Sequence, residues 1–388
     1  MTSFMFLAPA LAPFGEAVCG RQLALAAHAA GHRVTFLHTS SVAPVFEGVP
    51  FARGVIDDVL PTLGVALRDA VRARGVDVIV LVDALSTYGV LGSSMRASLE
   101  GCGAKVIALD LWSCHESDLV CDMGEITTKL DPLLVELPAL RPAPNARPDA
   151  PGAYRALPPV TPVTAEARRS TRARLGIGEH ERVVFTATGA WQAARKYPPA
   201  SSMYRIATAW PAALSLVLRR LDDVRVVHVG PEPLPLGDRY QHVPRVPPAE
   251  FERLLGASDV SVGNNVMATS IATALALDVP HVVIENSRFV ATSAEATTSE
   301  LRAWLAPVAP LYPFAVLPLG LRSFVAPMLA NNPFTIAIDR CDLLDPEATA
   351  ARMSALLEGD ATMSTARANY RERIAALPSG LEQLIALA

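Results

Sequence analysis

The sequence predicts an α/β protein of two doubly wound domains that face each other across a cleft. Three observations lead to this prediction. The 388 residues suffice for about two domains, at ~150 residues each. Apolar, strand-like runs alternate with Ala- and Leu-rich helical runs, as in parallel sheets with crossover helices. A proline-rich stretch between Leu137 and Arg168 interrupts this alternation once, which divides the chain.

The first half contains four strand-like runs separated by helical ones. The expected strands cover residues 4–9, 32–39, 76–84 and 104–112, and the expected helices cover residues 17–31, 60–75 and 88–103. The first two helices end at Gly31 and Gly75, and glycine is typical of a helix C-terminus. The run VDVIVLVDA is continuously apolar, which indicates a strand buried on both faces of a parallel sheet.

The second half repeats this pattern. The expected strands cover residues 181–190, 224–231 and 281–286, and the expected helices cover residues 202–221, 247–258 and 346–357. The last of these begins with Asp345 before Pro346, an N-cap followed by proline at the first helical position. Another apolar run stops at Asn264 and Asn265, just before a helix-like run. Because ligands bind outside the carboxyl ends of parallel strands, these asparagines are expected at a ligand site.

Composition argues against several classes of protein. The net charge is −4 and both signs are spread along the chain, without the basic stripe that nucleic-acid binding needs. The five cysteines form no CxxC pair, which favours a reduced, cytoplasmic chain. The first 20 residues contain no Lys or Arg and therefore lack the positive region of a signal peptide.

One uncharged stretch, residues 303–321, has the length of a membrane span. It contains four prolines, and each would break a helix. Irregular backbone is not tolerated in the hydrocarbon of a bilayer, so a buried or cleft-lining loop is expected instead. A patch that rests on a membrane surface is the alternative.

A resemblance to a known family emerges from longer stretches. The run YQHVPRVPPAEFERLLGASDVSVGNNVMATSIATALALDVPHVVIE resembles the donor-binding domain of GT-B glycosyltransferases, such as the enzymes that make lipid II and the natural-product transferases. PFGEAVCGRQLALAAHAAGHRVTFL is similar to their first loop and helix, and residues 343–374 are similar to their C-terminal helices. The resemblance implies two Rossmann-like domains that face a cleft, with C-terminal helices that cross back.

The resemblance and the proline-rich stretch together give the expected domains. An acceptor domain is expected at residues 1–140, a linker at 141–170, a nucleotide-donor domain at 171–365 and a helical tail at 366–388.

The resemblance places a nucleotide donor on the second domain. The base is expected near the loop of Val243 and Arg245. The diphosphate is expected at the N-terminus of the helix after Asn264 and Asn265, where backbone N–H groups and the helix dipole favour an anion. The hydroxyls of the first helical turn and the first loop of this domain would add further ligands. These additional candidates are Thr269, Ser270, Gly189, Arg195 and Lys196.

Structural alternatives exist for these residues. Asparagine tolerates left-handed backbone, so Asn264 and Asn265 can simply form a turn. Arg195 and Lys196 can be a solvated, cationic helix start. At the ribose, many members of the family use a helical Glu, but this chain has Thr273, which cannot offer two acceptor oxygens. Glu285, after the next strand, is the candidate substitute.

An inverting transferase needs a base that activates the acceptor hydroxyl. The first loop, APALAPFGEA, contains no His, and Glu16 is its only ionisable side chain. Glu16 is therefore the candidate base. The alternative is an acid in the first helical turn that complements the helix dipole.

A second polar cluster, DLWSCHESDLVCD, follows the strand at 104–112 and is expected at the edge of the first sheet. Asp110 and Trp112, with Asp83 after another strand, are expected on the acceptor side, and His115 and Glu116 are further catalytic candidates. Ordinary loop structure is the alternative. The Cys and His spacing in this cluster matches no standard zinc site, so no metal is predicted.

The sequence thus predicts a cytoplasmic, bacterial-type glycosyltransferase-like protein. It would transfer a sugar from a nucleotide-sugar to a natural-product, peptide or envelope-precursor acceptor, with no cofactor besides that substrate. Two alternatives remain open. One is a catalytically silent relative that binds a peptide or biosynthetic intermediate for partner enzymes, because fold alone does not establish function. The other is a relative that hydrolyses or epimerises nucleotide sugars.

Overall fold

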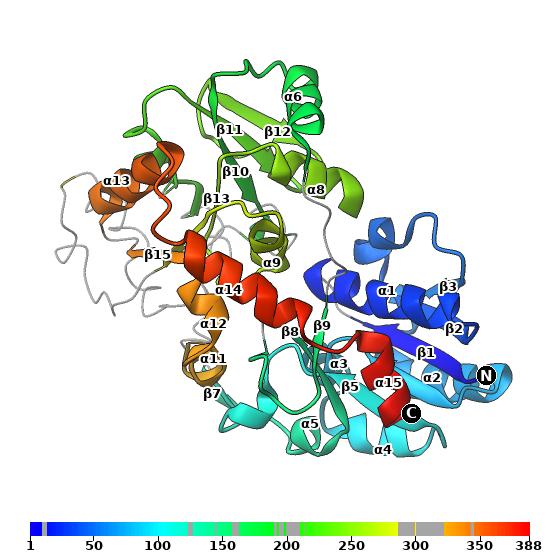
Figure 1. Cartoon of the computed structure of the whole chain (residues 1–388). Coiled ribbons are helices and arrows are strands. Elements are labelled where there is room, and N and C mark those ends of the chain that lie inside the picture. The colour runs from blue at the N-terminus through cyan, green and yellow to red at the C-terminus, as the bar shows by residue number, and fades with distance from the viewer. Residues whose placement is uncertain are drawn as a thin grey trace.

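The computed structural model contains two parallel sheets, one in each half of the chain (Figure 1). It describes residues 1–9, 14–122, 127–143, 146–156, 163–189, 192–193, 198, 210–212, 214–285, 299, 322–342 and 345–388. The uncharged stretch 303–321, residues 202–209 and 213 of the helix expected at 202–221, and both Arg195 and Lys196 lie outside the described residues.

The first sheet has seven parallel strands in the order β3-β2-β1-β4-β5-β8-β9. The strands are β1 (Ser3–Ala8), β2 (Arg33–His38), β3 (Ala52–Val55), β4 (Val78–Leu81), β5 (Lys105–Leu109), β8 (Ala139–Ala143) and β9 (Ala153–Arg155). The helices of this lobe are α1 (Phe14–Ala29), α2 (Leu63–Arg74), α3 (Ala84–Leu91), α4 (Met95–Glu100) and α5 (Leu133–Glu136). Short 3₁₀ helices are η1 (Ser40–Phe46), η2 (Asp57–Thr62), η3 (Gly92–Ser94) and η4 (Cys114–Glu116), and a small antiparallel pair joins β6 (Val120–Asp122) to β7 (Thr127–Lys129).

The second sheet has six parallel strands in the order β12-β11-β10-β13-β14-β15. The strands are β10 (Arg182–Ala187), β11 (Val224–Val229), β12 (Tyr240–Val243), β13 (Val260–Gly263), β14 (His281–Glu285) and β15 (Asp339–Asp342). Its helices are α6 (Ala165–Arg174), α8 (Pro248–Gly256), α9 (Thr269–Ala276), α11 (Arg322–Leu329), α12 (Pro333–Ile336) and α13 (Pro346–Leu357). Both sheets reverse strand order at a central strand, as doubly wound folds do, so the predicted fold class is confirmed.

The last two helices connect the lobes. In Figure 1, α14 (Ser364–Ala375) runs from the second lobe toward the first, and α15 (Gly380–Leu387) lies on the first lobe beside α1. Between them, the Arg155 amide of β9 donates to the carbonyl of Pro378 at 3.1 Å. The C-terminal helices therefore cross back, as the resemblance implied.

The proline-rich stretch contributes more than a linker, because β8 and β9 extend the first sheet. The tolerance of Pro142 within β8 has a geometric reason. The Arg141 amide donates to Gly152 beside β9, so the next nitrogen points toward β5. Pairing of β8 with β5 covers only Ala139 and Leu140, so Pro142, which lacks an N–H, lies beyond its end. The sheet thus reaches to residue 155, although the domain limits themselves stay a prediction.

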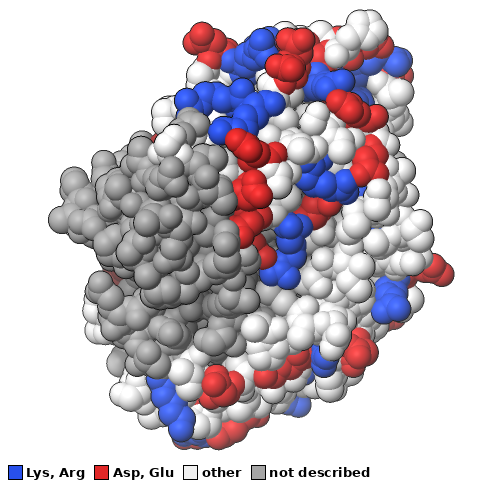
Figure 2. Space-filling view, turned by 90° about the vertical axis from the view of Figure 1, so that its left-hand side faces the viewer, with Lys and Arg blue, Asp and Glu red and all other residues white. Residues whose placement is uncertain are grey.

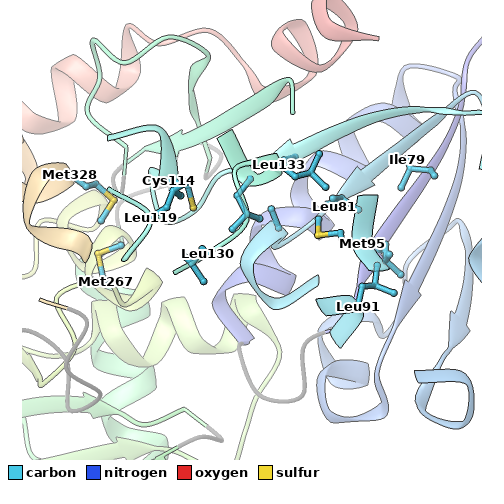
Figure 3. Packing of buried hydrophobic residues seen from close by; sticks show 14 of the residues in the cluster. Ile79, Leu81, Leu91, Met95, Cys114, Leu119, Leu130, Leu133, Met267 and Met328 are labelled. Atoms are coloured by element: carbon cyan, nitrogen blue, oxygen red, sulfur yellow. The ribbon is translucent and has the colours of Figure 1, made fainter. Parts of the chain in front are cut away.

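An apolar seam joins the two lobes (Figure 3). Met267 and Met328 of the second lobe lie close to Cys114 and Leu119 of the first, in one buried cluster that continues to Ile79 inside the first sheet. The elements that carry these residues also touch across the seam, since α11 of the second lobe contacts both η4 and β6 of the first. Burial of apolar side chains favours this contact by about 25 cal/mol per Å². The seam holds the lobes beside each other and fixes the cleft next to it.

The surface carries mixed charge. On the described part of the face in Figure 2, Lys and Arg side chains alternate with Asp and Glu. This face shows no single-sign field of the kind that would attract nucleic acid. None of the described helices has the length and apolar composition needed to traverse a bilayer.

Candidate functional site

A cavity of about 240 Å³ opens between the lobes. The first lobe contributes Gly15, Glu16, Val18 and Gln22 of α1, with Leu111 after β5. The second lobe contributes the carboxyl ends of its central strands and the first turn of α9. Its walls include Thr188, Gly189, Gln192, Gly230, Arg245, Glu252, Gly263, Asn264, Asn265, Thr269, Ser270, Thr273 and His281. The cavity therefore lies where parallel α/β sheets bind ligands.

The N-terminus of α9 faces this cavity. Thr269 and Ser270 occupy the first turn, where helical geometry leaves backbone N–H groups without a partner four residues back. The Met267 amide donates instead to Asn265 Oδ1 at 2.9 Å, and the Ala268 amide donates to the Asn265 carbonyl at 3.0 Å. Asn265 therefore forms the turn that the sequence allowed. An anion could still meet the amides of Thr269 and Ser270.

Asn264 links this turn to the first loop of the lobe. Gln192 Nε2 donates to Asn264 Oδ1 at 2.7 Å, and the Gly189 amide donates to Gln192 Oε1 at 2.7 Å. Gln192 thus bridges two segments that are 72 positions apart in the chain. This bridge brings Gly189 and both asparagines to the same end of the cavity, and their predicted role in donor binding stays a prediction.

Glu16 lies opposite, in the first turn of α1. Gly15 brings α1 close to α9, because an added Cβ on Gly15 would meet Thr269 Oγ1 at only 2.6 Å. Burial, with the charge of Asp83 adding to it, raises the pKa of Glu16 to about 8. A carboxyl group that holds its proton near neutral pH is therefore set beside the end of α9.

Asp83 is buried beneath Glu16, outside the cavity wall. It caps α3, since its carboxylate accepts from the Ser86 amide at 3.2 Å and from the Ser86 hydroxyl. Burial raises the pKa of Asp83, and the bonds from Ser86 oppose that rise. Trp112 also lowers the pKa of Asp83, because its indole N–H favours the ionised carboxylate. This N–H nevertheless makes no hydrogen bond with the described residues.

The polar cluster after β5 forms its own network. Asp110 is buried and accepts from the Cys114 amide at 2.8 Å and from Arg141 Nε at 3.2 Å. His115 Nδ1 lies 3.1 Å from Asp110, and Glu116 lies 3.4 Å from His115 Nε2. Burial alone would raise the pKa of Asp110, but hydrogen bonds from His115 and Cys114 and the Arg141 charge hold it below its ordinary value.

This network stands apart from the cavity. Asp110, Trp112, His115 and Glu116 do not line it, whereas the neighbouring Leu111 does. Arg141 of β8 and Arg147, which lies 3.4 Å from Glu116, hold the cluster from the side of the proline-rich stretch. The acceptor-side and catalytic roles of these residues remain predictions.

Three residues that were predicted to bind the nucleotide-sugar donor lie in different environments. Arg245 lines the cavity and donates to the carbonyl of Ser41 across the lobes at 3.3 Å. Val243 ends β12 and packs in the apolar core of the second lobe. Glu285 is buried at the end of β14 and accepts from Arg340 Nε at 2.7 Å. Of the three, only Arg245 reaches the cavity wall.

Two ionisable cavity residues escaped the sequence analysis. His281 opens β14 and is 4% exposed, and burial lowers the pKa of its imidazole to about 3. Glu252 lies on α8, and burial raises its pKa. Neither residue stands out in the sequence. Glu252 is one of two glutamates in a short helical run, and His281 merely follows Pro280 at the start of an apolar strand.

In the part of the chain that the structure describes, no group of three or more His, Cys, Asp or Glu side chains is arranged to hold a metal ion.

Comparisons with solved structures show the same fold over the whole chain. Spinosyn forosaminyltransferase SpnP matches with a TM-score of 0.55 and 16% identity, over 100% of this chain and 98% of that one. VinC, a glycosyltransferase in complex with dTDP, matches with a TM-score of 0.54 and 16% identity, over 100% and 98%. MurG from Acinetobacter baumannii matches with a TM-score of 0.51 and 12% identity, over 99% and 98%. The resemblance to GT-B glycosyltransferases is thus confirmed at the level of the fold.

A comparison with curated proteins found no match. Residues 22–388 match the model of one protein family, described as a family of unknown function. That match spans nearly the whole chain but begins after β1 and after Gly15 and Glu16 of α1. The chain therefore belongs to the family of unknown function DUF6365 and has the GT-B fold.

Proposed function

We propose that this protein is a glycosyltransferase that uses a nucleotide-sugar donor. One observation carries the proposal: a carboxyl group of the first lobe, Glu16, and the helix N-terminus of the second lobe, at Thr269 and Ser270, line a single cavity. Glycosyl transfer needs these two features side by side, a base for the acceptor and an anion site for the leaving diphosphate.

The donor would lie along the second lobe. Its diphosphate would accept hydrogen bonds from the amides and hydroxyls of Thr269 and Ser270, and Arg245 would add a positive charge at the cavity wall. Gln192 would keep Asn264 and the Gly189 loop in place around the phosphates. Arg195 and Lys196 stay predicted phosphate ligands.

The acceptor would enter from the side of the first lobe. The Glu16 carboxylate would take the proton of the acceptor hydroxyl as its oxygen attacks the anomeric carbon of the sugar. The bond from that carbon to the diphosphate oxygen breaks, and the diphosphate leaves with the bonding electrons. Because the pKa of Glu16 is about 8, activity should rise with pH up to that value. The acceptor would be a natural product, a peptide or an envelope precursor.

The first test is binding of nucleoside diphosphates, measured by thermal shift and calorimetry. One or more of them should stabilise the wild-type protein. Ser270→Ala should weaken binding of the diphosphate about tenfold, the effect of one hydrogen bond to a charged group, and leave binding of the matching nucleoside unchanged. A nucleoside that loses as much affinity as its diphosphate would contradict a phosphate site at α9.

A catalytically silent binding protein is the second candidate. The same pKa favours it, because a Glu16 that keeps its proton at neutral pH is a weak base there. Turnover measured from neutral to alkaline pH separates the two. Sugar transfer that appears as Glu16 ionises, and disappears in Glu16→Gln, supports the enzyme. Tight nucleotide binding without turnover at any pH supports the silent protein.

A further inference from the structure

Deep in the cavity, one buried nitrogen has no partner among the residues that the structure describes. His281 Nδ1 lies 2.7 Å from Ser261 Oγ, and the Ser261 hydroxyl donates to the carbonyl of Pro280 at 3.1 Å. A hydroxyl has one proton, so this arrangement assigns the imidazole proton to Nδ1, which donates to Ser261. The other nitrogen, Nε2, is then a hydrogen-bond acceptor, and it is buried without a partner among the described residues. Buried polar atoms of this kind require an explanation.

The unpartnered nitrogen faces the cavity. His281 is one of the lining residues, and a Cβ added to Gly263 would lie 3.5 Å from its Nε2. Glycine at this position thus places no side chain against the imidazole edge. His228, the other buried imidazole of this lobe, differs, because its Nε2 lies 2.7 Å from the Thr188 hydroxyl and its Nδ1 lies 2.7 Å from the Tyr240 hydroxyl. Of these two neutral imidazoles, only that of His281 keeps an acceptor for a ligand.

A second acceptor lies in the same wall. Glu252 of α8 is partly buried and makes no hydrogen bond or ion pair with any residue that the structure describes. By contrast, its neighbour Glu250 is bound by Arg174 and Arg253. Because α8 and α9 both precede strands of one parallel sheet and pack on the same face, they run in the same direction. Gly256 and Leu277 lie near each other, because a Cβ added to Gly256 would lie 3.7 Å from Leu277 Cδ1. Glu252 and Thr273 each lie four residues before this pair, so they lie at a similar depth.

The position of Glu252 and Thr273 along their helices indicates which part of a nucleotide would contact them. Thr273 lies one helical turn, about 5.4 Å, beyond Thr269 at the anion end of α9. One turn is comparable with the separation between the α-phosphate and the ribose hydroxyls of a nucleotide. A ribose offers two adjacent O–H donors, and the wall offers two acceptors that receive no hydrogen bond from the described part of the chain.

We propose that Glu252 and His281 Nε2 are the acceptors for the ribose 2′- and 3′-hydroxyls of a ribonucleoside diphosphate, and that they select ribose over 2′-deoxyribose. This inference rests on the proposed function, since it needs a nucleotide with its diphosphate at α9. It assigns the ribose contact to α8 and β14, and to neither Thr273 nor Glu285.

The test compares matched pairs of nucleotides by calorimetry: UDP with 2′-deoxy-UDP, ADP with 2′-deoxy-ADP, and GDP with 2′-deoxy-GDP. Wild type should bind the ribonucleotide about tenfold more tightly, the effect of one hydrogen bond to a charged acceptor. In Glu252→Ala this ratio should fall toward one. Glu250→Gln, on the same helix but outside the cavity wall, should leave the ratio unchanged and serves as the matched control.

Gly263→Ala tests His281 without replacing a buried side chain. Its methyl group would sit in ordinary contact with Nε2 and cover it, so binding of the ribonucleotide should weaken severalfold. Nitrogen NMR of the labelled imidazole gives an independent readout: His281 Nε2 should be unprotonated in the free protein and shift when UDP or another ribonucleotide binds.

The outcomes separate this assignment from the proposed function. Equal binding of ribonucleotide and deoxyribonucleotide by wild type overturns the assignment and leaves the proposed function intact. An unchanged preference for ribose in both Glu252→Ala and Gly263→Ala also overturns it. If no nucleoside diphosphate binds at all, the proposed function fails and this assignment fails with it.

Discussion

Replacing Glu16 with Gln should stabilise the folded chain at alkaline pH. The pKa of Glu16 is about 8 in the folded chain, against 4.5 for an ordinary Glu, because of burial and the nearby Asp83. Between these values the folded chain keeps a proton that the unfolded chain has lost. The contribution of Glu16 to stability is therefore fully present below pH 4.5, falls as the pH rises, and is lost above pH 8.

The size of the effect follows from the same difference. One pH unit corresponds to ~1.4 kcal/mol, so ionising Glu16 in the folded chain costs at most about 5 kcal/mol more than in the unfolded chain. Gln has a similar shape and cannot ionise, so Glu16→Gln removes this cost. Wild type and variant should have similar stability at acid pH, and the variant should be more stable by several kcal/mol, on the order of that bound, at alkaline pH.

Urea denaturation at about pH 5 and about pH 9 measures this directly, through the transition midpoints. Asp83→Asn provides an intermediate case, because Asn caps a helix as well as Asp does, while the variant removes the like charge. Its stability should fall less with pH than that of wild type. If Glu16→Gln and wild type lose stability in parallel between the two conditions, Glu16 is ionised in the folded chain and the reasoning about its burial is wrong.

Two further changes test the two ends of α9. Gly15→Ala should destabilise the chain by ~1–3 kcal/mol, because its methyl group would lie 2.6 Å from Thr269 Oγ1. Adding Thr269→Ala should restore the lost stability. If urea denaturation shows no effect of Gly15→Ala alone, α1 and α9 are not in close contact. Asp278 has φ of 59° and accepts from Arg367 at 3.1 Å and from Arg371 at 2.6 Å. Asp278→Ala should therefore cost ~1 kcal/mol more than Asp278→Gly, since both lose the ion pairs but only glycine relieves the left-handed backbone; equal midpoints would show that the backbone is unstrained.

Local patterns in the sequence predicted the elements and their class. Alternating apolar and helical runs gave β1, β2, β4 and β5 and the equivalent strands of the second lobe, because burial on both faces requires continuous apolar strands. The loop after β13 and the helix start at Thr269 followed from the same pattern, and so did the acid at Glu16 in the first turn of α1. Short, half-exposed strands such as β3, β12 and β15 have no such signal and were not predicted.

The sequence by itself thus determined the order of strands and helices in two doubly wound halves, several helix ends, and the carboxylate of Glu16 at the start of α1. Only the tertiary structure decided which of these meet. Gly15 faces Thr269 across more than 250 positions, β8 and β9 join the first sheet despite their prolines, and His115 bonds to Asp110 outside the cavity. Burial also raised the pKa of Glu16 and left His281 Nε2 without a partner among the described residues. The physical reason is that desolvation and strand pairing depend on neighbours distant in the chain, which no local pattern records.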